Sequence, residues 1–348
     1  MTQLSVGSLF AGIGGICMAF SNEGYTVKWA NEFDAKACDT YRYNFQHPLY
    51  EQDIREIKYP EQLGYVDIIT SGFPCQAFSI AGYRQGFHDQ KGRGNLFFET
   101  ARFIEAIQPE AYLLENVKNL VSHDKGRTFT VIRDTLTKEL NYSFIPFILN
   151  SKDYGNVPQT RERIYIVGFK NEGHIVASLN ENVKDNLFLD QQSKSAKFII
   201  PEKIKLLQTI EDIITKKTVD RAYYYLPDHP YYSKLKQQLV REDTLYQWRR
   251  VYVRENKNKV CPTLTANMGT GGHNVPLVKI GNQIRKITPE ECLAFQGFNP
   301  NFSFPPELAK SHRYKQAGNS VTVPVLQRIA FNIKYALFQC IAFNQIAV

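Results

Sequence analysis

Short apolar runs alternate with helical patterns of hydrophobic residues through the first half of the chain, and this rhythm constrains the fold more than any other feature. Such spacing is typical of βαβ units, in which helices connect parallel strands. Ligands of these sheets bind beyond the carboxyl ends of the strands. The sequence therefore predicts an α/β fold with a doubly wound, mostly parallel sheet. Strands are expected over residues 4–9, 26–30, 66–70, 111–114, 144–149 and 164–169, and helices over 14–20, 34–43, 96–107 and 128–140.

The regular rhythm stops after about residue 171, where charged residues, tyrosines and loops follow without βαβ spacing. From residue 284 the pattern becomes regular again, and residues 321–338 form an apolar-striped helix that can pack back onto the sheet. We therefore expect a large lobe over residues 1–180, completed by residues 311–348, and a smaller irregular lobe over residues 181–310.

Composition favours an intracellular protein with a polyanionic partner. The 348 residues include 42 Lys+Arg against 34 Asp+Glu, a net charge of +8, and nucleic acid is the commonest polyanion. The N-terminus shows no secretory signal, and no apolar run approaches the roughly 18 residues of a membrane span. Six scattered cysteines without a C-x-x-C pair predict reduced thiols and no metal site. We expect a cytoplasmic protein.

A glycine-rich turn, FAGIGG at residues 10–15, follows the first expected strand. It lets the backbone approach a ligand at the start of the next helix. Glu32 closes the second strand, where a carboxylate can accept hydrogen bonds from both hydroxyls of a ribose, and Asp53 is placed to meet an adenine amino group. Because Cys17 replaces the third glycine of a dinucleotide motif, turn glycines with solvated acids are the alternative interpretation.

Three further positions carry side chains suited to chemistry. Cys75 lies in the Pro-stiffened loop GFPCQ after a strand, where a nucleophile belongs, although a loop-filling cysteine is the alternative. Glu115 ends another strand and suits a general acid or a partner of a ring nitrogen. Arg161 and Arg163 are two residues apart on an extended chain, so both can reach one site, unless they form a solvated edge with Glu162.

The order of these motifs resembles one family closely, the cytosine-C5 DNA methyltransferases of prokaryotic restriction–modification systems. The resemblance covers nearly the whole chain except about residues 175–260. The matching blocks are SLFAGIGG (8–15), NEFD (31–34), GFPCQAFS (72–79), GRGNLFFE (92–99), LENV (114–117), QTRER (159–163), RKITPEECLAFQGF (285–298) and QAGNSV (316–321).

The resemblance implies a role for each matching residue. Cys75 resembles the nucleophile that adds to C6 of cytosine, and Glu115 resembles the carboxylic group that binds N3 and the exocyclic amine. Arg163, with Arg161 close by, resembles the partner of the O2 side. An S-adenosylmethionine pocket is implied at Phe10, Ala11, Gly12, Gly14, Glu32, Asp53, Pro74, Leu96, Asn319 and Ser320. A base within a duplex hides C6 from a thiol, so the target cytosine must be flipped out.

The smaller lobe has the composition of a DNA-facing surface. Residues 233–260 hold eight basic and three acidic side chains, with aromatic residues interleaved. Arginines can read guanine edges and lysines can hold phosphates, although a solvated helix face is the alternative. We expect contacts with double-stranded DNA from Gln76, Ser79, Arg249, Arg250, Thr263 and Thr265.

The resemblance thus implies a DNA (cytosine-5-)-methyltransferase that acts as a monomer on a short specific duplex site, with a cognate restriction endonuclease acting separately. One rival is a transfer RNA cytosine-C5 methyltransferase of the same fold, but that branch lacks a large recognition insert. The other is a catalytically inactive DNA-binding relative, against which the intact Cys75, Glu115 and Arg163 argue.

Overall fold

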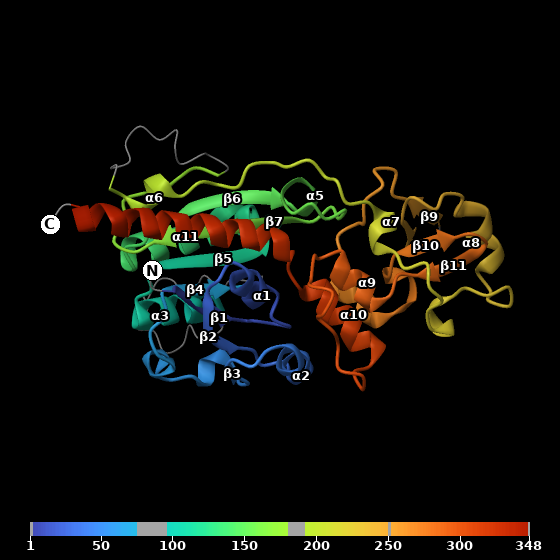
Figure 1. Cartoon of the computed structure of the whole chain (residues 1–348), viewed down its shortest axis with the longest axis horizontal. Helices are drawn as coiled ribbons and strands as arrows, with labels where there is room; N and C mark the ends of the chain where they lie inside the picture. The colour runs from blue at the N-terminus through green and yellow to red at the C-terminus, as the bar shows by residue number, and fades with distance from the viewer. Residues whose placement is uncertain (1–2, 75–95, 180–191, 250–251, 347–348) are drawn as a thin grey trace.

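The computed structural model describes residues 3–74, 96–179, 192–249 and 252–346, and its larger part is a seven-stranded sheet (Figure 1). The strand order is β3-β2-β1-β4-β5-β7-β6; β7 runs antiparallel to both of its neighbours, and the strands from β3 to β5 are parallel. This confirms the doubly wound, mostly parallel sheet. The strands are β1 (Ser5–Leu9), β2 (Thr26–Asn31), β3 (Leu49–Tyr50), β4 (Ile68–Ser71), β5 (Ala111–Val117), β6 (Ile145–Asn150) and β7 (Glu162–Phe169).

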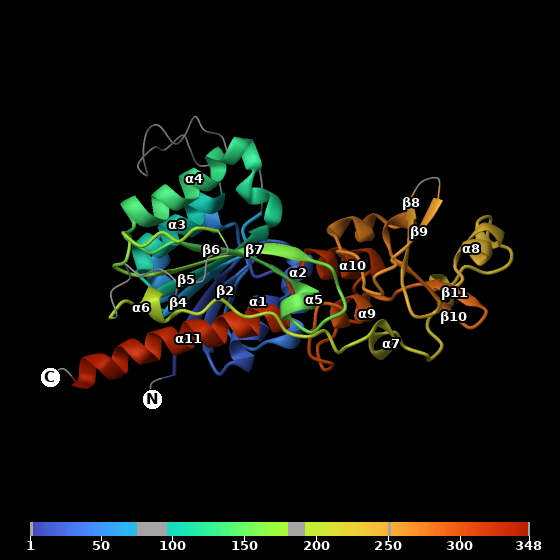
Figure 2. The same ribbon diagram turned by 90° about the horizontal axis from the view of Figure 1, so that it is seen from above.

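Helices cover both faces of this sheet, with α3 and α4 on one face and α1 and α11 on the other (Figure 2). Successive strand residues alternate between the two faces, so Ile68 joins the core under α1 and α11 while Ile69 joins the core under α3. Burial on both faces explains why the strands are nearly continuous apolar runs. The helices of this part are α1 (Gly15–Asn22), α2 (Ala35–Asn44), α3 (Leu96–Ile107), α4 (Arg127–Asp134), α5 (Ser151–Tyr154), α6 (Lys194–Lys197) and α11 (Val323–Ile346).

Several element ends differ from the expectation. Strand β5 continues to Val117, so Glu115 and Asn116 lie within the strand. The helix expected over residues 128–140 is α4 followed by one π-helical turn over Thr135–Glu139. Residues 192–204 lie along the large sheet, where α6 packs on α11 and Phe198 packs on Phe147, although the expected division placed them in the smaller lobe.

The smaller part of the protein contains a regular sheet, which the sequence did not predict. Four antiparallel strands lie in the order β11-β10-β8-β9 and enclose a core with Leu235, Tyr246 and Trp248. Helices α9 and α10 lie between this sheet and the large one (Figure 1). The elements are α7 (Ile210–Ile213), α8 (Tyr232–Gln238), β8 (Tyr246–Arg249), β9 (Tyr252–Glu255), β10 (Leu277–Ile280), β11 (Gln283–Lys286), α9 (Pro289–Ala294) and α10 (Lys310–Asn319).

Candidate active site

The glycine-rich turn between β1 and α1 forms the floor of the site. Phe10, Gly12 and Gly14 all have positive φ angles, of 53°, 56° and 88°. A Cβ atom on Gly14 would lie 2.2 Å from the Phe45 ring, so a side chain cannot be accommodated there. The turn therefore depends on glycine both for its backbone conformation and for its close packing.

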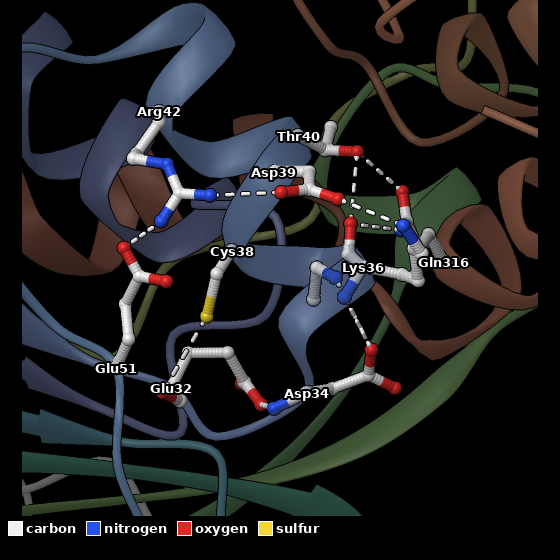
Figure 3. A network of polar contacts seen from close by, with 10 residues as sticks. Glu32, Asp34, Lys36, Cys38, Asp39, Thr40, Arg42, Glu51 and Gln316 are labelled. Carbon is white, nitrogen blue, oxygen red and sulfur yellow. Dashed lines mark hydrogen bonds and ion pairs between the residues drawn. The ribbon is translucent and has the colours of Figure 1, made fainter. Parts of the chain in front are cut away.

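The Glu32 carboxylate accepts hydrogen bonds from three backbone amides, one of which belongs to this turn (Figure 3 shows its position beside α2). Gly12 donates to Oε2 at 2.8 Å, while Phe33 and Asp34 donate to Oε1 at 2.9 and 2.8 Å. A carboxylate has about four acceptor positions, so Oε2 keeps capacity for a hydroxyl group. The side chain is 8% exposed and faces a cavity, as a ribose ligand requires.

That cavity has a volume of about 400 Å³ and opens at the carboxyl ends of β1, β2, β4 and β5. It brings together residues that are far apart in the sequence. Among the predicted site residues, its walls include Phe10, Ala11, Gly12, Glu32, Pro74, Glu115, Arg161, Arg163, Asn319 and Ser320. Gly14 does not line this cavity. It lies within the turn and packs against the Phe45 ring.

A smaller cavity of about 130 Å³ contains the two remaining cofactor candidates, Asp53 and Leu96. It shares Phe10, Glu32 and Phe33 with the larger cavity, so the two spaces adjoin. Asp53 caps a short helical turn and is paired with Arg55, which lowers the pKa of the Asp53 carboxyl. All the predicted cofactor residues except Gly14 therefore line one of these two adjoining cavities.

Glu115 and Arg163 form the polar end of the larger cavity. The Arg163 Nε atom lies 3.1 Å from Glu115 Oε1, which is an ion-pair distance. The direction of this contact does not satisfy hydrogen-bond geometry, and Oε1 has no hydrogen-bond partner among the described residues. Glu115 as a residue is 9% exposed and this oxygen is buried, and a buried carboxylate oxygen without a donor is suited to a bound base.

Arg161 is directed away from this pair and into the protein. Its terminal nitrogens donate to the carbonyl oxygens of Leu264, Gly318 and Ser320 at 2.8, 3.4 and 2.5 Å. Burial lowers the pKa of Arg161 to about 9, and the nearby Arg163 charge acts in the same direction. Arg161 precedes β7 and still lines the larger cavity together with Arg163, as the alternation predicted, but its terminal nitrogens are bonded within the protein.

The loop that carries Cys75 begins at the end of β4. Asn116 donates from Nδ2 to the Phe73 carbonyl oxygen at 2.8 Å and so fixes the chain two residues before Cys75. The other cysteines whose burial is described are Cys17, Cys38, Cys261 and Cys292, all buried. Burial raises the pKa of each of these thiols, to about 12 for Cys38, and disfavours them as nucleophiles. Cys75, Gln76, Ser79 and Arg250 lie outside the described residues.

A separate cavity of about 540 Å³ lies in the smaller part of the protein, between the β8–β9 hairpin and the loop that begins at Thr263. It brings together three predicted DNA contacts, Arg249, Thr263 and Thr265. Arg249 donates to the Gln247 side chain at 3.1 Å, and none of the described residues places a carboxylate within ion-pair distance of it. Other polar residues of this wall are Tyr252, Asn267, His273 and Asn274.

Not all of the basic residues over 233–260 are available to a polyanion. Arg241 and Lys259 both pair with Asp243, at 2.8 and 2.7 Å. These two cations hold the pKa of the Asp243 carboxyl well below its ordinary value. Part of the local positive charge therefore stabilises the smaller lobe itself.

Two residues with a place in the site were missed by the sequence reasoning. Phe33 is 68% exposed and lines both of the adjoining cavities, and its signal was an aromatic residue directly after the candidate ribose acid. Asn116 was seen only as part of the LENV block, and no sequence signal shows that its amide holds the Phe73 carbonyl.

No group of three or more His, Cys, Asp or Glu side chains suited to a metal occurs among the described residues. In the same part of the chain, no helix is both long and apolar enough to cross a bilayer.

Comparisons with known proteins agree with this geometry. The family model described as C-5 cytosine-specific DNA methylase matches residues 4–335. Type II methyltransferase M.Bsp6I of Bacillus sp. (strain RFL6) is 52% identical over 95% of this chain and 98% of its own length. Type II methyltransferase M.HhaI of Haemophilus parahaemolyticus is 36% identical over 97% of this chain and 96% of its own.

Solved structures show the same fold at lower identity. A DNMT2 mutant of Spodoptera frugiperda superimposes with a TM-score of 0.68 at 19% identity, covering 95% of this chain and 100% of that one. A putative DNA modification methyltransferase from an E. coli prophage gives a TM-score of 0.67 at 19% identity, covering 97% and 100%. The chain therefore belongs to the C-5 cytosine-specific DNA methylase family and is a DNA (cytosine-5-)-methyltransferase.

Proposed function

We propose that this protein flips a cytosine out of a short specific duplex site and methylates it at C5, with Cys75, Glu115 and Arg163 as the reacting group of side chains. The observation that carries this proposal is the Glu115–Arg163 pair at the end of the large cavity, in which one buried carboxylate oxygen finds no hydrogen-bond partner within the described part of the chain. The likeness to type II methyltransferases supports a role as the modification enzyme of a restriction–modification system.

The two adjoining cavities fit S-adenosylmethionine. Glu32 offers Oε2 to the ribose hydroxyls, and the exposed Phe33 ring together with Phe10 offers apolar surface to the adenine. Asp53 and Leu96 line the smaller cavity and would hold the adenine edge, while Ala11, Gly12, Pro74, Asn319 and Ser320 line the larger one. The bound cofactor supplies an electrophilic methyl group on a sulfonium sulfur.

The protein's own groups prepare the cytosine to attack that methyl group. The Cys75 thiolate forms a bond to C6, and Glu115 donates a proton or hydrogen bond to N3, which makes C5 nucleophilic. Arg163 contacts the O2 side of the base and keeps Glu115 in place. After C5 has gained the methyl group, C5 loses its proton to a base, and the electron pair of that C–H bond expels the thiolate from C6.

For Arg161 we propose a positioning role in place of the base contact that the sequence suggested. Its terminal nitrogens are engaged with three backbone carbonyls, so we assign it to positioning the cavity wall rather than to contact with the base. The buried Arg161 joins the loop that contains Leu264 to the cofactor wall at Ser320.

The smaller lobe reads the DNA through the cavity that contains Arg249, Thr263 and Thr265. Arg249 has its charge available, and Gln247 can present an amide to a base edge beside it. The division into a catalytic domain (1–180 with 311–348) and a recognition domain (181–310) belongs to this proposal, except that residues 192–204 pack on the large sheet and go with the catalytic domain. Action as a monomer, a separate cognate endonuclease and a cytoplasmic location at the nucleoid also belong to this proposal.

Methyl transfer to two polymers tests this function. The protein, incubated with cofactor carrying a labelled methyl group, should label duplex DNA containing its site and leave transfer RNA unlabelled. Bisulfite sequencing of DNA from cells that express the protein should show the modified cytosine within one recurring sequence. Label in transfer RNA alone would favour the RNA methyltransferase, and binding without label in either polymer would favour the inactive relative.

A further inference from the structure

Helix α10 lies between the two sites, and on one side it contacts the loop over residues 263–270, which lines the cavity of the smaller part. A Cβ atom on Gly318 would lie 2.1 Å from the Thr265 carbonyl carbon, so the helix and the loop touch backbone to backbone. The loop also approaches the helix closely from its own side, because a Cβ atom on Gly269 would lie 2.7 Å from the Ser311 carbonyl oxygen. The Gly318 contacts are all with backbone atoms, and Gly269 packs against the Ser311 backbone and the Lys315 Cβ atom, so a shift of the loop is transmitted directly to α10.

The other side of α10 is bonded to helix α2 through Gln316 (Figure 3). Thr40 donates from Oγ1 to Gln316 Oε1 at 2.7 Å, and Gln316 Nε2 donates to the Lys36 carbonyl oxygen at 2.7 Å. Gln316 is 7% exposed and Thr40 is fully buried, so water does not replace these bonds readily. Next to them, Lys315 pairs with Asp34 at 2.9 Å.

Helix α2 in turn begins at the ribose carboxylate. Asp34 caps the first turn of α2, and its own backbone amide donates to Glu32 Oε1 at 2.8 Å. Helix α10 ends at the cofactor wall, because Gly318, Asn319 and Ser320 line the larger cavity. A continuous set of contacts therefore connects Thr265 to Glu32.

We infer that Gln316 is a positioning residue that couples the two binding events, so that duplex DNA at the Thr263–Thr265 loop and the cofactor at Glu32 strengthen each other. DNA that fixes this loop holds α10 against α2, and α2 then holds the Glu32 carboxylate in the orientation that accepts the ribose. Such coupling is reciprocal, so the cofactor tightens DNA binding by the same factor. The inference rests on the proposed function, which places DNA at one end and the cofactor at the other.

The test is the ratio of two dissociation constants for one ligand, the Kd without the target duplex divided by the Kd with it. The Kd of S-adenosylhomocysteine, the product without the methyl group, is measured by calorimetry with and without the target duplex. In the unaltered protein the duplex should lower this Kd by about 5-fold or more, the lower end of ordinary allosteric factors. In Gln316→Leu, which keeps the volume but not the bonds, the ratio should fall towards one. Gln316 also lines the larger cavity, so the Kd without DNA is measured beside it and the ratio alone reports the coupling.

Two matched variants separate coupling from loss of stability. Thr40→Val removes the hydroxyl that Gln316 accepts and should also lower the ratio, whereas Thr40→Ser keeps a hydroxyl and should retain it. Asn44→Leu is the control, because Asn44 lies on α2 but exchanges hydrogen bonds with Ser303, at 2.9 and 3.0 Å, instead of with α10. It should lower the melting temperature and leave the ratio unchanged.

The outcomes are distinct. A ratio of one in the unaltered protein, or an unchanged ratio in both Gln316→Leu and Thr40→Val, overturns the coupling while the proposed function stands. If Gln316→Leu fails to fold, the contrast between Thr40→Val and Thr40→Ser decides the matter alone. Failure of the unaltered protein to bind either the duplex or S-adenosylhomocysteine overturns the proposed function instead.

Discussion

The larger cavity at the sheet edge and the cavity beside the β8–β9 hairpin, for which we propose DNA recognition and which is called the recognition cavity below, hold their polar side chains in opposite ways. Glu32 and Arg161 are 8% and 3% exposed, and each makes three hydrogen bonds to backbone groups. In the recognition cavity Arg249 is exposed and bonded to a neutral side chain, and Tyr252 is 56% exposed. Catalysis requires side chains that are held in position before the substrate binds. Side chains of a DNA-reading surface can instead find their hydrogen-bond and ion-pair partners on the DNA. The two cavities should therefore respond differently to substitution.

The largest effect is expected from Glu115→Gln. An amide cannot donate a proton to N3, so the rate of methyl transfer should fall by about 100-fold or more. DNA affinity should change little, because the recognition cavity is separate. Single-turnover rates with saturating duplex and cofactor measure this. Glu162→Gln is the control, since this nearby carboxylate is exposed and pairs with Lys118 at 3.2 Å. Equal rates in the two variants would remove Glu115 from the reaction.

Glu32→Ala should weaken cofactor binding by about 1.5–3 kcal/mol, the range for hydrogen bonds to a charged group. It should also lower the melting temperature, because three backbone amides lose their acceptor. Calorimetry with S-adenosylmethionine and a thermal scan report the two effects separately. Glu51→Ala serves as the control, because its carboxylate belongs to the same polar network but pairs with Arg42 (Figure 3). An unaltered affinity in Glu32→Ala would refute the ribose assignment.

Replacing Arg249 and Arg250 together by alanine should weaken DNA binding and reduce the dependence of log K on log salt by up to about 2 units, since each phosphate contact contributes about 0.9. Cofactor affinity without DNA should stay the same. Arg241→Ala is the comparison, because Arg241 is paired with Asp243 at 2.8 Å and should change the salt dependence less. If the double variant keeps the salt dependence of the unaltered protein, the hairpin is solvated surface and does not contact DNA.

The smallest effect is expected from Asp34→Asn, which keeps the cap of α2 but removes the charge that pairs with Lys315. Burial opposes ionisation of Asp34, yet the hydrogen bonds from Lys315 and from the helix amides outweigh it and lower the pKa of this carboxyl. A lowered pKa stabilises the fold above the ordinary carboxyl range, and the stabilisation is lost as pH falls through the lowered value. Urea unfolding should show a loss below about 1 kcal/mol at pH 7 that disappears in acid. A loss that persists in acid would contradict this.

The sequence predicted the two regions unequally, and the reason is physical. Glu32 and Glu115 could be placed because parallel strands end at one edge of the sheet and the strands are apolar runs that are easily seen. The smaller sheet was missed because its strands are four residues long and include charged stretches such as QIRK at 283–286 and YVRE at 252–255. The inward turn of Arg161 depends on carbonyl groups that lie more than a hundred residues away along the chain, so no local pattern shows it.

The central claim is that Cys75 attacks C6 of the flipped cytosine, and a covalent trap tests it most directly. Duplex DNA with 5-fluorocytosine at the target should form a stable adduct in the presence of S-adenosylmethionine, because fluorine at C5 cannot leave as a cation and the thiolate is not released. Cys75→Ser should form none, since a serine hydroxyl is scarcely ionised near neutral pH. Intact-mass analysis and peptide mapping should place the adduct at Cys75. An adduct at another cysteine, or no adduct although duplex and cofactor both bind, would contradict the account.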